Sequence, residues 1–93
     1  MRNYEFTVIF DTADDNVTTG KELVSQGFKA NNVTVQKEED LGIKFLAYPI
    51  KKNDKGHYFY YELQAEPDTI AKMENTFRLH DPLLKFLFVK KDK

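Results

Sequence analysis

The sequence predicts an α+β fold in which two helices cover one face of a four-stranded antiparallel sheet. Four segments alternate apolar and polar residues with the period of a strand, and two others repeat apolar residues at helical spacing. Their order is βαββαβ, in which two right-handed crossovers surround a central hairpin. This order defines a ferredoxin-like sandwich with the first and third strands in the middle. The strands are expected at residues 4–10, 33–41 with 43–51, 57–65 and 83–90, and the helices at residues 17–30 and 67–79.

Glycine and proline mark the boundaries of these elements. Gly42 predicts a bulge in the long second strand, and Pro49, which cannot donate to a strand ladder, predicts that this strand lies at a sheet edge. The segment NDKG at residues 53–56 predicts the hairpin turn. Pro67 suits the first turn of the second helix. The first helix has weak intrinsic propensity, so packing against the sheet must hold it.

The parity of the third strand decides which of its aromatic residues face outward. Glu62 and Gln64 must stay in contact with water, so Tyr58 and Tyr60, which share their parity, are expected on the open face of the sheet. The opposite parity, expected beneath the helices, contains Phe59, Tyr61 and Leu63.

The same parity test predicts an apolar patch on the helix-free face. The inward positions of the last strand are Leu84, Phe86 and Phe88, and the outward positions are Lys85, Leu87 and Val89. With the outward residue of the first strand, the patch consists of Ile9, Tyr58, Tyr60, Leu87 and Val89. Such a patch usually marks a partner or ligand site, although scattered exposed apolar residues are ordinary.

Charge is nearly balanced but unevenly distributed. The net charge of −1 and a pI near 6.1 argue against a protein that coats nucleic acid through its overall field. Acidic residues dominate the first half, and lysines cluster after it at Lys44, Lys51, Lys52, Lys55, Lys85, Lys90, Lys91 and Lys93. The distribution is that of a basic edge, or of lysines that solvate strand edges and a tail.

Composition and motifs exclude several classes of protein. The length of 93 residues fits a single domain over 1–93 with a short basic tail at 91–93. Cysteine is absent, and the two histidines have no metal-ligand partners, so we expect no metal site. No glycine-rich phosphate loop and no pairing of nucleophile and base occurs, so we expect neither a cofactor nor catalysis. The N-terminus has no secretory or membrane-spanning segment, which favours a cytoplasmic protein.

Two known uses of this architecture fit the residues poorly. The segment KGHYFYYE loosely matches the third-strand signature of an RNA-recognition motif, but His57 stands where an aromatic ring is wanted and Tyr58 where glycine or alanine is wanted. Acyl-phosphate phosphatases need an anion cradle after the first strand, and the loop DTADD would repel a phosphate there. We therefore predict neither a two-base stacking platform nor a phosphatase.

Four segments resemble the family of bacterial small-subunit ribosomal protein six. They are MRNYE at the start, LAYPI at residues 46–50 followed by Lys51, GHYFYYEL after the hairpin, and TFRLHDPLLKFLFVK at residues 76–90. The resemblance covers essentially the whole chain and is weakest between Asp11 and Gln36. It implies a non-catalytic component of the small-subunit platform. Such a protein pairs with ribosomal protein eighteen and binds the central domain of small-subunit ribosomal RNA, with no DNA or membrane partner.

Carried over residue by residue, the resemblance implies two sets of contacts. RNA phosphates or sugars are expected at Arg2, Lys44, Lys51, Lys52 and Lys55, with Lys85 and Lys90 added from the final strand. The partner protein is expected at Tyr58, Tyr60, Leu87 and Val89. Two features depart from the family pattern. Lys44 and Phe45 stand where members commonly have two arginines, and the chain ends at Lys93 without the tail that many members have.

A second class of function is compatible with the same residues. A small ferredoxin-like module whose sheet face self-associates or holds a regulatory ligand would have a similar fold and a similar patch. Binding to RNA and the oligomeric state of the isolated chain separate the two hypotheses.

Overall fold

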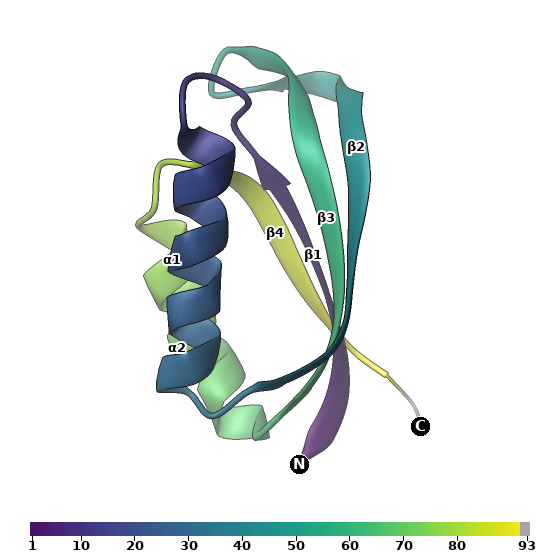
Figure 1. The fold of residues 1–93 in the computed structure, drawn as a ribbon, viewed down its shortest axis with the longest axis vertical. Helices are drawn as coiled ribbons and strands as arrows, with labels where there is room; N and C mark the ends of the chain where they lie inside the picture. Colours follow the sequence, from purple (N-terminus) through teal and green to yellow (C-terminus); the bar gives the residue numbers. More distant parts are fainter. Residues whose placement is uncertain (92–93) are drawn as a thin grey trace.

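The computed structural model describes residues 1–91 and has one antiparallel sheet with both helices on the same face (Figure 1). Its elements are β1 (Arg2–Phe10), α1 (Asn16–Ala30), β2 (Thr34–Ile50), β3 (Asn53–Ala65), α2 (Pro67–Arg78) and β4 (Leu83–Lys90). The strand order β2-β3-β1-β4 places β1 and β3 in the centre. The ferredoxin-like class predicted from the sequence is confirmed. Of the basic tail expected at 91–93, residues 92–93 lie outside the described part.

The hairpin turn lies two residues earlier than the sequence predicts. Lys51 and Lys52 connect β2 to β3 with φ values of 50° and 66°, and Ile50 pairs with Asn53 across the turn. A two-residue connection with both residues in the left-handed region matches the right-handed twist of its strands. The prediction of a turn at residues 53–56 was wrong. It relied on the preference of Asn and Gly for turns, whereas two lysines form the turn in the left-handed conformation, which is uncommon for residues other than glycine.

Aromatic rings build most of the core between the sheet and the helices. Phe6 of β1 lies at its centre, with ring centroids 4.4 Å from Phe88, 5.6 Å from Phe28 and 5.7 Å from Phe77. Edge-to-face and tilted pairs of this kind add to the free energy gained from burial. Residues from both helices and from two other strands, β3 and β4, therefore pack on one ring of the first strand.

The predicted parity of β3 is confirmed by burial. The residues beneath the helices are at most 4% exposed and are Phe59, Tyr61 and Leu63. Tyr58 and Tyr60 lie on the open face and are half-buried. On β4 the pairing shifts between Ile9 and Phe10, so Leu83 joins the main core. Leu84, expected there, is buried but lies outside that cluster.

We expect opposite outcomes for two neighbouring substitutions in β3. Phe59→Ala should lower the free energy of unfolding by about 3–5 kcal/mol, because it removes a buried ring that packs edge-on against Phe10. Tyr60→Ala should lower it much less, because that side chain lies on the open face. Urea denaturation of both variants measures the difference. A larger loss for Tyr60→Ala would mean that the two faces have been inverted.

Candidate nucleic-acid and partner interface

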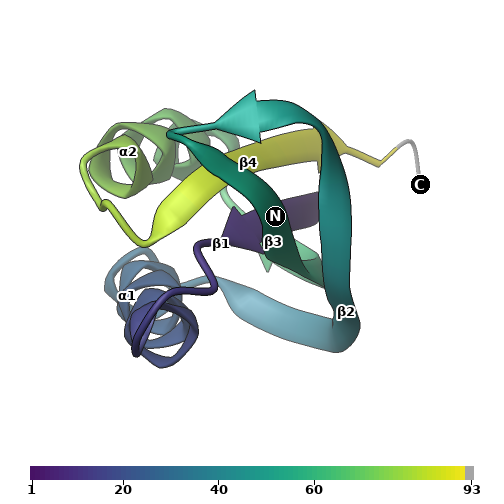
Figure 2. The same cartoon turned by 90° about the horizontal axis from the view of Figure 1, so that it is seen from above.

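The distal part of the β2–β3 hairpin, residues 43–57, forms an arm that bends over the helix-free face of the sheet. Figure 2 shows β2 sweeping around the side of the sheet away from the helices towards β4. The Lys85 Nζ atom of β4 lies 3.5 Å from the Tyr48 hydroxyl of the arm. The arm thus crosses β1 and contacts the far edge strand.

The arm covers part of the apolar patch predicted for the open face. Ile9, expected to be exposed, is only 8% exposed, because it lies in a hollow beneath the arm with Tyr58. The arm residues that line this hollow are Leu46, Ala47, Tyr48 and Ile50. Gly56 permits the arm to lie close to β1, since a side-chain carbon at position 56 would collide with the Ile9 methyl group. The prediction for Ile9 was wrong because a strand pattern carries no information about a hairpin folding back.

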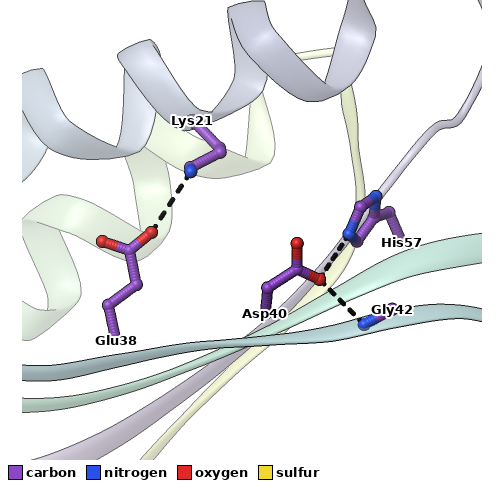
Figure 3. A network of polar contacts seen from close by, with 5 residues as sticks. All are labelled: Lys21, Glu38, Asp40, Gly42 and His57. Carbon is purple, nitrogen blue, oxygen red and sulfur yellow. Dashed lines mark hydrogen bonds and ion pairs between the residues drawn. The ribbon is translucent and has the colours of Figure 1, made fainter.

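A carboxylate clasp holds the bulge from which the arm begins (Figure 3). The backbone N–H of Gly42 donates to the Asp40 Oδ1 atom at 2.8 Å, and the His57 Nε2 atom lies 2.6 Å from the same oxygen. Gly42 has φ of 85°, a conformation that glycine adopts without strain. The bulge in β2 is therefore tied to β3 by one side chain.

The clasp also favours the ionised form of the Asp40 carboxyl group. The hydrogen bond from His57, followed by that from Gly42, holds the pKa of Asp40 below its usual value of 3.8. Beside it, the Lys21 Nζ atom of α1 pairs with a Glu38 carboxylate oxygen of β2 at 3.2 Å (Figure 3). The helix-facing side of β2 is thus held to α1 by an ion pair and to β3 by the Asp40 carboxylate.

The seven basic residues predicted to contact RNA divide between the two ends of the sheet. Those near the hairpin are Lys44, Lys51, Lys52, Lys55 and Lys85. Arg2 and Lys90 lie at the opposite end, near the termini (Figure 1). All seven are exposed, and within residues 1–91 none of them forms an ion pair. The fold therefore brings five of the seven together.

Arg78 joins this basic end, although the sequence did not predict it. A hollow of about 320 Å³ between the hairpin tip, α2 and β4 is lined by Lys51, Arg78 and Lys85, together with Glu74. Arg78 ends α2, where a cation also interacts favourably with the helix dipole. Only the tertiary fold brings it near the hairpin, so no local signal identified it.

The part of the open face that the arm leaves uncovered combines acidic and apolar groups. Glu5 of β1 pairs directly with Glu62 of β3, which places two like charges side by side. The Tyr60 hydroxyl lies 3.1 Å from a Glu5 oxygen and 3.0 Å from a Glu62 oxygen, and Lys91 lies 3.7 Å from Glu62. Burial is the main cause that raises the pKa of Tyr60, and the two carboxylates raise it further. The hydroxyl therefore stays protonated and can donate.

Apolar groups continue from this acidic pair towards β4. Leu87 and Val89 are 59% and 44% exposed. Next to Leu87, a hollow of about 340 Å³ extends to Thr7, Ile9 and Tyr58. Of the predicted partner-facing residues, Tyr58 and Leu87 thus line one hollow, while Tyr60 and Val89 lie elsewhere on the uncovered surface.

The described residues offer no metal centre. Within residues 1–91, no group of three or more His, Cys, Asp or Glu side chains could hold a metal ion. In the same part of the chain, neither helix has the length and hydropathy needed to cross a bilayer.

These features define a ferredoxin-like protein with a basic hairpin end and a mixed acidic and apolar sheet face. Residues 3–90 match the family model described as Ribosomal protein S6, and the chain belongs to this family. Small ribosomal subunit protein bS6 of Treponema pallidum is 33% identical over 92 residues, which cover 99% of both chains. The protein of the same name from Leptospira biflexa is 36% identical over 90 residues, 97% of each chain.

Solved structures show the same fold at lower identity. The crystal structure of 30S ribosomal protein S6 from Thermotoga maritima has a TM-score of 0.86 at 20% identity, covering 97% of this chain and 87% of that one. The C-terminal domain of the MgtC protein from Mycobacterium tuberculosis has a TM-score of 0.66 at 13% identity, covering 99% and 89%. Both likenesses concern the fold.

The clasp should make stability depend on acid in a defined direction. Because the folded-state pKa of Asp40 lies below the unfolded value of 3.8, its contribution is present above that pH and is lost as the pH falls through the lowered pKa. Asp40→Asn should therefore lower stability at neutral pH and flatten its fall in acid. Urea denaturation at several pH values, with Asp54→Asn on the arm as a matched control, measures this. Parallel pH profiles for Asp40→Asn and the unaltered protein would contradict it.

Proposed function

We propose that this protein is a structural, non-catalytic component of the small ribosomal subunit. In it, the chain binds the central domain of small-subunit ribosomal RNA as a heterodimer with ribosomal protein eighteen. Membership of the Ribosomal protein S6 family, with a match over residues 3–90, is the observation that carries the proposal. The relatives in Treponema and Leptospira bear the name of a small-subunit protein, which places the proposed site of action on the ribosome.

The basic hairpin end supports the RNA half of the proposal. Its cations include Lys44, Lys51 and Lys55, which are exposed and available to replace counterions along a phosphate backbone. The whole chain has a net charge of −1, so its overall field gives RNA little attraction. Affinity must then come from this local surface and from whatever a partner adds. Binding by the isolated chain is expected to be weak.

The uncovered sheet face supports the partner half. The paired carboxylates Glu5 and Glu62 repel one another across β1 and β3, and a cation from another protein would relieve that repulsion. Leu87 and Val89 beside them offer apolar area of the kind found at interface centres. A basic protein with apolar anchors fits both features.

The two surfaces meet at one residue, which makes a composite RNA site geometrically reasonable. Lys85 lies near the arm and also lines the hollow that leads to Leu87. A partner on the uncovered face would therefore border the basic hairpin end. Arg2 and Lys90 lie about 30 Å away, the length of a nine-residue strand, so contacts there need an RNA that runs along the sheet.

We expect the heterodimer to bind a transcript of the central domain far more tightly than this chain alone. The reason is that the isolated chain presents only its local basic end. A filter-binding or calorimetric titration with and without ribosomal protein eighteen measures both affinities. Equal, tight binding by the chain alone would contradict the composite site.

The isolated chain tests the competing hypothesis of an interaction module. Light scattering after size exclusion should show a monomer if the open face is reserved for a different protein. A stable homodimer that Tyr60→Glu disrupts, together with no binding of the transcript, would favour self-association instead.

Two lysine substitutions should change the salt dependence of RNA binding. Lys44→Ala and Lys51→Ala should each reduce the slope of log affinity against log salt concentration by up to about one, as for the loss of one phosphate contact. Lys72→Ala, an exposed lysine on α2, is the matched control and should leave the slope unchanged. Unchanged slopes for both arm lysines would remove them from the proposed site.

A further inference from the structure

The most exposed aromatic side chain of the arm has no role in the fold. Phe45 of β2 is 80% exposed and belongs to neither the core nor its partly buried periphery. Within residues 1–91, no aromatic ring packs against it and no cation lies over it. A large apolar side chain kept in water on the arm suggests a surface that becomes covered on binding.

Strand alternation places Phe45 on the outer face of the arm. Lys44 lies over the Tyr58 ring at 5.5 Å on the inner face, so the next residue along β2 points the other way. Ile43, two residues earlier on the same face, is 58% exposed. The outer face of the arm is therefore a short apolar strip, separate from the apolar hollow that covers Ile9.

One lysine stands on the same face as this strip. Lys55 pairs directly with Phe45 across the hairpin and so stands on the same face, and Lys44 is its neighbour in sequence. Lys51 and Lys52 form the turn beyond it. An aromatic ring with free faces beside a cation is an arrangement that binds unpaired nucleotides, because the base stacks on the ring while the cation contacts a phosphate.

We propose that Phe45 is a stacking platform for an unpaired base of the bound RNA, with Lys55 contacting a flanking phosphate. The inference rests on the proposed function, since it names the kind of nucleotide that the basic hairpin end holds. A protein partner fits this face less well, because protein interfaces are depleted in lysine and Lys55 stands beside Phe45 on it. The RNA segment recognised is a loop, bulge or junction rather than a continuous helix.

Substitutions at Phe45 separate stacking from simple apolar contact. In the heterodimer bound to the central-domain transcript, Phe45→Leu should weaken binding by roughly 5- to 150-fold, the range that loss of one stacked base produces. Phe45→Tyr keeps the ring and should bind within about twofold of the unaltered protein. Leu79→Ala, which removes an apolar side chain that is 81% exposed at the end of α2, is the control and should have no effect. The salt slope should stay unchanged in Phe45→Leu, in contrast to the lysine variants.

Two further readouts decide the inference. Ultraviolet crosslinking of the complex should yield an adduct of Phe45 with a single unpaired nucleotide. Full binding by Phe45→Leu, or a loss confined to association with ribosomal protein eighteen, would overturn it. If the unaltered heterodimer does not bind the transcript, the proposed function fails. If it binds and Phe45→Leu binds equally well, only the stacking inference fails.

Discussion

The clasp of Asp40 on Gly42 and His57 is the interaction on which the shape of the functional surface depends. The Asp40 carboxylate accepts the Gly42 N–H within the bulge of β2, and its contact with His57 ties that bulge to β3. Bulges bend a strand and increase its twist, so the rest of the hairpin leaves the plane of the sheet and crosses the open face. With the second irregularity of β2, between Phe45 and Ile50, this bend accompanies the burial of Ile9 and the contact between Tyr48 and Lys85.

The sequence predicted those features that depend on local periodicity. Element order, the sheet order and the division of the rings of β3 followed from alternation and from two polar residues, Glu62 and Gln64, that needed water. The prediction failed where the chain folds back on itself. Ile9 was expected to be exposed because nothing in its strand reports a covering arm, and the turn was placed at 53–56 because Lys51 and Lys52 are unusual in left-handed conformations.

The candidate site was predicted in part for the same reason. The structure places the hairpin lysines near one another, as their closeness in sequence predicts, because a hairpin keeps neighbours together. Arg78 was missed, since a helix end reaches the hairpin tip only through the packing of α2 beside β4. Arg2 and Lys90 were grouped with the hairpin lysines, although the length of the sheet separates them. The near-neutral total charge conceals this separation into a basic end and a face with an acidic pair.

The turn formed by Lys51 and Lys52 implies a conflict between the stability of the hairpin and the positive charge at its tip. Each non-glycine residue in the left-handed region is disfavoured by roughly 1–2 kcal/mol, and Lys51 and Lys52 both adopt it. Asparagine followed by glycine would relax the same turn, but it would leave the tip electrically neutral. A hairpin engineered for robustness at this point would therefore be expected to become a poorer ligand for polyanions, and natural variation here should reflect that compromise.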